Sequence, residues 1–193
     1  MPLCLINGDI GDIMELKEKE HPKLLVRQVV VVTTISENGI ANAAPFSFSS
    51  PISFDPALFG FSCNPKHDTW QNIQKTKDFV VNVISEDFGT LMKILETDYD
   101  YEVNEIEKAG LIEEKSKKVK SPRIKEANAW IECSFEDSVK LGDHIWIVGK
   151  VRCVEVKDEL WDNVIDLDQA KNLCHIGGKF FAGDIKIKEY ERA

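Results

Sequence analysis

The sequence lacks the long apolar runs that are typical of membrane proteins and exported proteins. No apolar run approaches the roughly 20 residues that a membrane-spanning helix needs. Residues 1–9 have neither a basic start nor a long apolar centre, so no signal peptide is expected. We therefore expect a cytoplasmic protein that has no membrane partner.

Short catalytic motifs are also missing. The chain has no Gly-x-Gly-x-x-Gly, no phosphate loop that ends in Gly-Lys-Ser/Thr, no Gly-x-Ser-x-Gly and no His-Glu-x-x-His. These absences argue against a Rossmann nucleotide site, a serine hydrolase and a zinc peptidase. Any nucleotide-like cofactor must therefore be held by another arrangement.

Positive charges are fewer than negative charges, and closely spaced cysteines are absent from the sequence. The net charge of −9 argues against a nucleic-acid partner, because phosphate backbones require a basic surface. It still allows a small anionic ligand that a few local donors hold. The five cysteines form no Cys-x-x-Cys pair, so we expect no metal site and no redox dithiol. Buried, reduced thiols are the simpler interpretation.

The apolar pattern predicts a single domain over residues 1–193, built mainly of strands. A length of 193 residues and an apolar fraction of 43% suit one globular core. Strands are predicted over residues 24–35, 40–49, 57–63, 79–84, 129–139, 144–156 and 180–188. Helices are predicted over residues 10–19 and 167–172, from Asp68 onward with Gln71 completing a capping box, and in the polar stretch 86–125. Many strands with short connections favour an antiparallel barrel over a doubly wound sheet.

Small residues and hydroxyls gather in two neighbouring segments, residues 42–50 and 68–72. Small side chains beside Pro45 leave backbone amides accessible to a flat ligand. The hydroxyls lie one strand away from a helix start, whose free amides favour an anion. This combination suits a planar heterocycle that carries a phosphate. The alternative interpretation is a strand of ordinary small core residues, followed by a plainly capped helix.

Short sequence segments, taken in their order along the chain, extend this interpretation to most of the sequence. They are residues 33–34, 38–39, 42–47, 55–56, 68–72, 79–83, 104–111, 122–124, 132–133, 142–144, 148–151 and 175–181. In this order and spacing the chain resembles the FMN-binding split-barrel family of flavin reductase-like proteins. It departs from the family pattern before the first strand, where Val26, Arg27 and Gln28 stand in place of a frequent proline. Arg27 then either adds a phosphate contact or marks an earlier start of the strand.

The resemblance implies a mainly β fold, an FMN-binding split β-barrel that is antiparallel and Greek-key-like, with peripheral helices. It implies FMN as the cofactor, FAD being less favoured, and a homodimer with the flavin near the subunit interface. The flavin ring would lie along the first segment, formed by Asn42, Ala43, Ala44, Pro45, Phe46 and Ser47. The phosphate would lie near Ser49, Ser50, Lys66 and Thr69, beside Asp68 and Asn72 at the helix start.

The implied activity is that of an NAD(P)H-dependent flavin reductase, in which NADH or NADPH passes hydride to N5 of the flavin. The resemblance places His144 on the nicotinamide side, and its alternative is a plain turn histidine. His175 stands before two glycines that suggest close backbone approach, whereas His67 is interpreted as a surface residue. The basic run over residues 115–125 either meets dinucleotide phosphates or, as we favour, is a solvated loop.

Two other functions use the same evidence. A flavin-binding electron carrier or redox sensor needs the same binding residues but has no reductase activity of its own. A barrel that has lost flavin and only mediates association is the third alternative.

Overall fold

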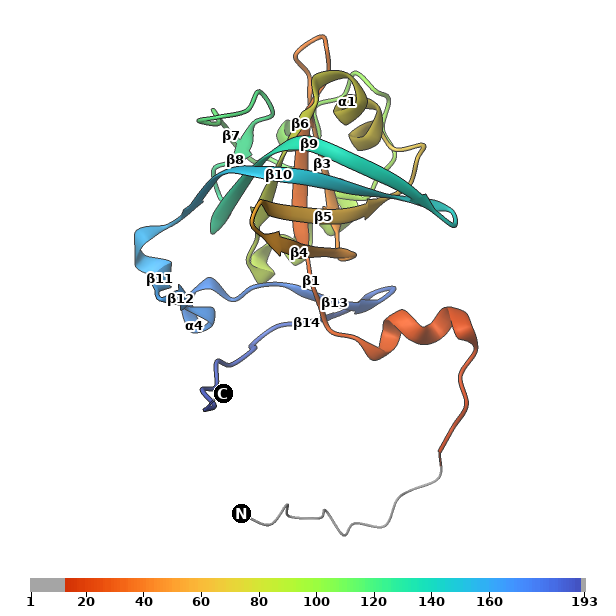
Figure 1. The fold of residues 1–193 in the computed structure, drawn as a ribbon, viewed down its shortest axis with the longest axis vertical. Helices are drawn as coiled ribbons and strands as arrows, with labels where there is room; N and C mark the ends of the chain where they lie inside the picture. The colour runs from red at the N-terminus through yellow and green to blue at the C-terminus, as the bar shows by residue number, and fades with distance from the viewer. Residues whose placement is uncertain (1–12, 192–193) are drawn as a thin grey trace.

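A seven-stranded antiparallel sheet, curved into a split barrel, forms the body of the protein (Figure 1). The structure, a computed structural model, describes residues 13–191. The strand order in the barrel is β3-β2-β6-β9-β10-β5-β4. These strands are β2 (Val30–Ile35), β3 (Ala41–Phe46), β4 (Ser49–Phe54), β5 (Ala57–Cys63), β6 (Asp78–Val83), β9 (Ala129–Leu141) and β10 (His144–Val156). The predicted mainly β, antiparallel split barrel is confirmed.

Smaller elements flank the barrel. The remaining strands are β1 (Arg27–Gln28), β7 (Glu113–Glu114), β8 (Arg123–Ile124), β11 (Trp161–Asp162), β12 (Val164–Ile165), β13 (Cys174–Gly177) and β14 (Phe180–Ala182). The helices are η1 (Glu18–Leu24), α1 (Asp68–Thr76), η2 (Glu86–Leu91), α2 (Met92–Leu95), α3 (Glu105–Lys108), η3 (Asp158–Leu160) and α4 (Leu167–Ala170). Strands β1, β13 and β14 form a separate sheet below the barrel in Figure 1, and η1 packs on β13.

The central strands β2 and β6 are buried on both faces, which explains their continuous apolar sequence. Val30 faces the barrel interior with Phe61 and Phe79, whose ring centroids lie 5.2 Å apart. Val31 and Val80 point the other way, into a second core that packs against η2, α2 and α3. Side chains alternate between the two faces of a strand, so one run of β-branched residues supplies both cores.

The predicted N-terminal helix, residues 10–19, lies partly outside the described residues, and its described part is wrong. Residues 13–17 have no regular structure, and the 3-10 helix η1 that follows contains Pro22. A proline lacks the amide hydrogen that a longer α-helix needs. The strand predicted over residues 24–35 is interrupted at Val29, whose N–H donates to the Leu173 carbonyl at 2.8 Å instead of to the barrel.

Two details around the small-residue segment also differ from the prediction. The strand over residues 40–49 is two strands, because the chain turns between Phe46 and Ser49 while the Phe48 carbonyl accepts the Ser62 N–H at 2.8 Å. The capping box is wrong: the N-cap of α1 is the residue before Asp68, and no side chain caps it. Gln71 instead donates its Nε2 to Asp68 Oδ1 at 3.2 Å.

The polar stretch 86–125 is the largest error of the sequence prediction. Only η2, α2 and α3 are helical there, and most of residues 109–125 is irregular chain. Carboxylates of the barrel hold this chain: Glu132 accepts the Lys117 and Lys118 N–H groups at 2.8 and 2.6 Å, and Asp78 accepts those of Lys120 and Ser121 at 3.0 Å each. Such long-range contacts leave no periodic signal in the sequence.

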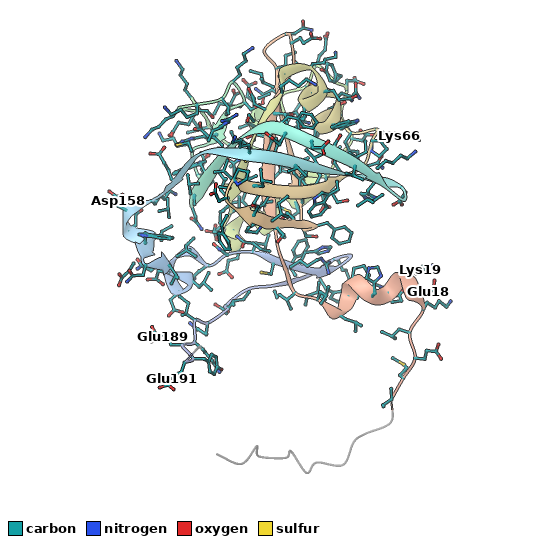
Figure 2. The ribbon with its side chains drawn as sticks, viewed as in Figure 1. Glu18, Lys19, Lys66, Asp158, Glu189 and Glu191 are labelled. Atoms are coloured by element: carbon teal, nitrogen blue, oxygen red, sulfur yellow. The ribbon has the colours of Figure 1, made fainter. Side chains whose placement is uncertain are left out.

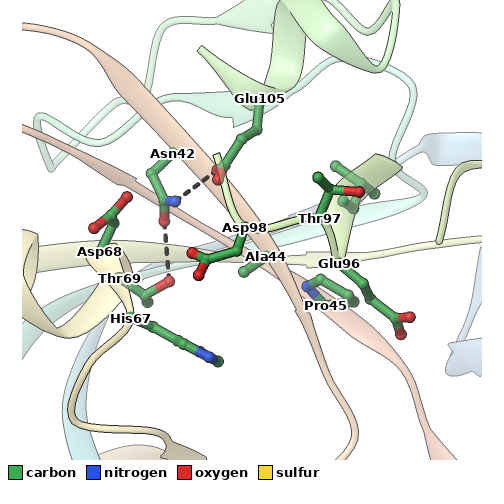
Figure 3. A pocket seen from close by; sticks show the side chains of 11 residues that line it. Asn42, Ala44, Pro45, His67, Asp68, Thr69, Glu96, Thr97, Asp98 and Glu105 are labelled. Carbon is green, nitrogen blue, oxygen red and sulfur yellow. Dashed lines mark hydrogen bonds between the residues drawn. The ribbon is translucent and has the colours of Figure 1, made fainter. Parts of the chain in front are cut away.

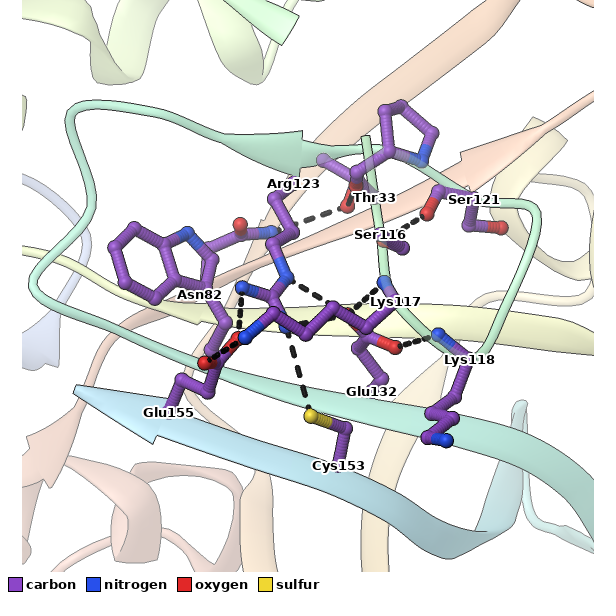
Figure 4. A network of polar contacts seen from close by, with 12 residues as sticks. Thr33, Asn82, Ser116, Lys117, Lys118, Ser121, Arg123, Glu132, Cys153 and Glu155 are labelled. Carbon is purple, nitrogen blue, oxygen red and sulfur yellow. Dashed lines mark hydrogen bonds and ion pairs between the residues drawn. The ribbon is translucent and has the colours of Figure 1, made fainter. Parts of the chain in front are cut away.

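The basic run in this stretch is only partly the solvated loop that we favoured. Its lysines are exposed, but Arg123 is 3% exposed and pairs with the buried Glu132 (Figure 4). The interpretation as a solvated loop is therefore wrong for Arg123.

Elsewhere the predicted elements are confirmed with small shifts. Strands β5 and β10 have the predicted bounds, and β9 runs on to Leu141. The last strand, predicted to reach residue 188, ends at Ala182 and pairs with β13, which the prediction missed.

Packing in the barrel predicts that Gly149→Ala strongly destabilises the fold. A Cβ at Gly149 would overlap Phe79 Cζ and would lie 2.8 Å from Cys133 Cβ, so the core must shift. Overpacking of this kind costs about 1–3 kcal/mol, which urea denaturation measures. Gly89→Ala is the matched control, since the nearest atom, of Leu173, lies 4.0 Å away. Equal stability of the two variants would contradict the packing described here.

Candidate functional site

Strand β3 is an edge strand, and this explains the proline in it. In the described part of the chain β3 pairs only with β2, so its other edge has no strand partner. The Ala43 N–H points to this free edge, where it donates to the Glu105 carboxylate at 2.6 Å. Backbone groups alternate between the edges of a strand, so Pro45 also faces the free edge. A proline is tolerated there because no ladder hydrogen bond is lost.

A cavity of about 220 Å³ opens beside the free edge of β3 (Figure 3). We call it the acidic cavity, because its lining includes Asp68, Glu96, Asp98 and Glu105. Thr69 Oγ1 donates to Asn42 Oδ1 at 2.9 Å, and Asn42 Nδ2 donates to Glu105 at 2.6 Å. The side chain of Asn42 is thus fixed between α1 and α3.

Buried polar side chains hold Asn42 from behind. Thr34 Oγ1 donates to Asn42 Oδ1 at 3.2 Å and accepts Asn72 Nδ2 at 3.0 Å. Asn72 Oδ1 in turn accepts the Tyr101 hydroxyl at 2.6 Å. A satisfied network of this kind fixes a unique orientation, so Asn42 presents a preorganised wall to the cavity.

Two carboxylates of the acidic cavity, Glu105 and Asp68, have raised pKa values. Burial raises the pKa of Glu105 to about 7 against its hydrogen bonds from Ala43 and Asn42, and the charges of Asp68 and Asp98 raise it further. Burial also raises the pKa of Asp68, with Asp98 as the second cause. The acidic cavity is therefore a poor place for a phosphate.

A second cavity, of about 390 Å³, adjoins the first. We call it the basic cavity, because its lining includes Lys19, Lys23, Arg27, His67, His144 and His175. Pro45 and His67 line both cavities, so the two meet along β3. One continuous site thus runs from a negative to a positive end.

Arg27 and His175 join distant segments at the basic cavity. Arg27 Nη2 donates to the Ile176 carbonyl at 2.9 Å and to His175 Nδ1 at 3.4 Å. Ser47 Oγ lies 3.2 Å from the same Nδ1, and His175 Nε2 lies 3.0 Å from the Gly178 carbonyl. Since a guanidinium only donates and a carbonyl only accepts, His175 fits the tautomer that carries its proton on Nε2. Arg27 Nε is buried and has no hydrogen-bond partner among residues 13–191.

The structure brings most of the predicted site residues together. The acidic cavity is lined by Asn42, Ala44, Pro45, Asp68 and Thr69, and the basic cavity by Pro45, Phe46, Ser47 and His144. The side chain of Ala43 lies in the outer core, and only its N–H reaches the site. His144 is 38% exposed and its Nδ1 lies 2.7 Å from Asp143 Oδ1.

Three predicted phosphate ligands lie apart from both cavities. Ser49 and Ser50 belong to β4, and Ser50 Oγ donates to the Pro51 carbonyl at 2.8 Å. Lys66 is exposed beside the start of α1, as Figure 2 shows. The assignment of these residues to the phosphate stays a prediction.

Sequence reasoning missed the part played by Glu105 and His67. Glu105 opens α3 next to Asn104, whose side chain caps that helix by accepting the Ile106 and Glu107 N–H groups. This local cap signals a helix, but nothing local signals that the helix covers β3. His67 is exposed, as expected, yet it lines both cavities.

The fold defines the class of protein, a split barrel, and the candidate site is a two-part cavity along its edge strand β3. The chain belongs to the family of the flavin reductase like domain, whose model matches residues 23–182. It is 30% identical over 133 residues to a flavin reductase of Pseudomonas putida. The aligned region covers 68% of this chain and 74% of that protein.

Two solved structures show the same fold. Nitrilotriacetate monooxygenase component B from Bacillus cereus is 26% identical to this chain, with a TM-score of 0.82. The aligned region covers 91% of this chain and 95% of the other chain. An FMN-binding protein from Thermus thermophilus, with bound p-hydroxybenzaldehyde, is 22% identical, covers 93% and 97%, and has a TM-score of 0.76.

Residues 13–191 contain neither a membrane-spanning helix nor a recognisable metal site. No helix in this part of the chain is long and apolar enough to cross a membrane. No cluster of three or more His, Cys, Asp or Glu side chains there is arranged to hold a metal ion. Burial raises the pKa of the Cys63 and Cys133 thiols to about 12, whereas Cys4 lies outside the described residues.

Proposed function

We propose that this protein is an FMN-binding oxidoreductase that accepts hydride from NADH or NADPH, as flavin reductases do. The observation that carries the proposal is the free edge of β3, which lies between the acidic and basic cavities. A backbone edge offers hydrogen bonds to the polar rim of a flat ring. Cavities of this size and of opposite charge suit a ligand that is neutral at one end and anionic at the other.

The chain's own residues fit such a cofactor. The backbone of Pro45 faces the free edge, Ser47 lines the basic cavity, and the small side chain of Ala44 lets a planar ring approach. The buried Arg27 Nε, which has no partner among the described residues, marks a donor that an anion would satisfy. The ring would therefore lie along residues 42–47, held from the side by Asn42.

We place the phosphate in the basic cavity, near Lys23 and Arg27, although the sequence favoured Lys66 and Thr69. Thr69 is 1% exposed and its hydroxyl already donates to Asn42. The acidic cavity that it lines repels a dianion, whereas the basic cavity attracts one. Arg27 also brings a positive charge and the unpartnered Nε donor, since its two Nη groups already donate to backbone carbonyls.

Bound FMN would supply the redox chemistry, with N5 as the hydride acceptor. The protein's part is to orient the ring and to admit the nicotinamide. His144 lines the basic cavity from the hairpin between β9 and β10, where it would orient the incoming donor. No general base is needed for hydride transfer.

A homodimer is part of the proposal. Large apolar side chains are exposed on the elements that carry the basic cavity: Leu24 is 71%, Leu25 56% and Phe180 64% exposed. Apolar exposure next to a ligand site is typical of an interface. A second subunit would cover these side chains and close the site.

Comparing FMN with riboflavin tests the placement of the phosphate, because riboflavin lacks that group. We expect Arg27→Met to weaken FMN binding by roughly tenfold or more and to leave riboflavin binding nearly unchanged. Lys66→Met is the matched control and should change neither affinity. Fluorescence titration measures both ligands. A larger loss in Lys66→Met would move the phosphate to the start of α1.

Turnover separates the reductase from a flavin-binding electron carrier. We expect steady-state oxidation of NADH or NADPH when FMN is added to the purified chain. Tight FMN binding without turnover would contradict the reductase and favour the carrier.

A further inference from the structure

A third cavity lies at the end of the barrel where β6 and β10 end and β9 begins, and it is separate from the proposed flavin site. It has a volume of about 390 Å³, and strands β6, β9 and β10 and the hairpin β11-β12 contribute to its lining. We call it the barrel-end cavity. It shares no lining residue with the acidic or the basic cavity. Barrel mouths are frequent places for small-molecule sites, and this volume suits a ligand of one or two rings.

The walls of the barrel-end cavity are apolar and partly open to solvent. Val83, Ile131 and Val156 form its inner wall, and Ile131 packs on the barrel core. Val154 is 64% exposed and Trp161, on β11, is 56% exposed. An indole ring at the rim offers a flat apolar surface, on which another aromatic ring stacks favourably.

One buried polar group in the lining has no partner. Asn172 is 7% exposed, and its Oδ1 accepts no hydrogen bond from any of residues 13–191. The residue is held in place by its backbone, which bridges to Ser85. An unsatisfied buried acceptor destabilises the free protein. A ligand that donates a hydrogen bond to it therefore gains more binding free energy than it would from a hydrogen bond to a solvated acceptor.

The charges around the cavity indicate a neutral ligand. No Lys, Arg or His side chain is among the lining residues, so an anion would find no counter-charge. Glu155 is the one ionisable lining residue in the described chain, and its carboxylate already pairs with Arg123, at 2.6 Å, and with Lys117. A cation would have to compete with both partners.

We infer that the barrel-end cavity binds a small neutral aromatic molecule that stacks on Trp161 and donates one hydrogen bond to Asn172 Oδ1. Phenols and indoles are the chemical class that combines a flat apolar ring with a single N–H or O–H donor. This site is independent of the proposed flavin site, and its test needs no flavin.

Calorimetric titration with indole and with benzothiophene, which has nearly the same shape but no donor, tests the inference. We expect the wild-type chain to bind indole about tenfold more tightly than benzothiophene. Asn172→Leu keeps the volume but removes the acceptor, so this preference should disappear. Trp161→Ala should weaken both ligands several-fold. Phe54→Ala is the matched control, since Phe54 is 99% exposed and does not line the cavity.

Each contrary result would overturn the inference. These results are no detectable indole binding by the folded wild-type chain, equal affinity for the two ligands, or unchanged binding in Trp161→Ala. Sedimentation tests a second copy as the occupant. A wild-type dimer that dissociates in Trp161→Ala, but not in Phe54→Ala, would assign the cavity to the subunit interface instead.

Discussion

Arg123→Met is expected to lower the free energy of unfolding by about 3–5 kcal/mol, because it leaves a carboxylate buried without its counter-charge. Arg123 is 3% exposed and Glu132 0%. Arg123 Nε donates to Glu132 Oε1 at 2.7 Å, and its Nη1 pairs with Glu155 at 2.6 Å (Figure 4). Glu132 also holds the backbone of the loop before β8. Urea denaturation at neutral pH measures the loss.

Lys117→Met is the matched control for this effect. The Lys117 side chain is 60% exposed where it pairs with Glu155, so its loss should destabilise the fold far less than the loss of Arg123. The double variant Arg123→Met, Glu132→Met should be far less destabilised than the sum of the single variants, because it removes both charges. A small effect of Arg123→Met, or strict additivity, would contradict a buried ion pair.

Glu105→Gln is expected to abolish a pH dependence of stability. Burial raises the pKa of Glu105 from 4.5 to about 7, so between these values the folded protein holds a proton that the unfolded chain has released. Stability contributed by this group therefore falls as pH rises from about 4.5 to about 7. At about 1.4 kcal/mol per pKa unit the wild type should lose at most about 3 kcal/mol relative to the variant.

The comparison is made by urea denaturation of both proteins between pH 4.5 and 7.5. Gln keeps a carbonyl oxygen for the Ala43 N–H, so the variant should fold, and the difference between the two curves cancels other titrating groups. Glu107→Gln, at an exposed position of the same helix α3, is the matched control and should follow the wild type. Parallel curves for wild type and Glu105→Gln would show that Glu105 titrates normally.

Much of the fold could be predicted because its signals are local. The strands over residues 57–63 and 144–156 have runs of β-branched and aromatic residues between clear turns, and both match the structure. The segment around Pro45 was selected as a candidate site because of its small residues and its proline, and the structure places it on the edge strand β3. Local chemistry and global position agree there. The role of this segment in flavin binding stays a prediction.

The rest of the site depends on contacts between distant residues. Glu105 reaches the amide of Asn42 across 63 residues of sequence, and His175 reaches Ser47 across 128. Neither pair has a periodic or motif signal. The phosphate was predicted at Ser49, Ser50, Lys66 and Thr69, in part because helix starts attract anions. We propose the basic cavity instead, because Asp68, Asp98 and Glu105 make the cavity beside α1 acidic. Which charged side chains lie together in one cavity is visible only in the folded chain.

The helix prediction for the polar stretch 86–125 was wrong for the same reason. Its charged residues resemble a helix surface, whereas Asp78 and Glu132 on the barrel accept hydrogen bonds from its backbone and fix an irregular loop. Arginine is usually a surface residue, but Arg123 is buried like a core residue.

A crystal of the chain grown with saturating FMN tests the central claim most directly. The flavin ring should lie against the outward edge of residues 42–47, beside Asn42, with the phosphate within hydrogen-bond reach of Arg27. A flavin bound elsewhere, or a β3 edge still closed by Glu105 with no flavin beside it, would contradict the account.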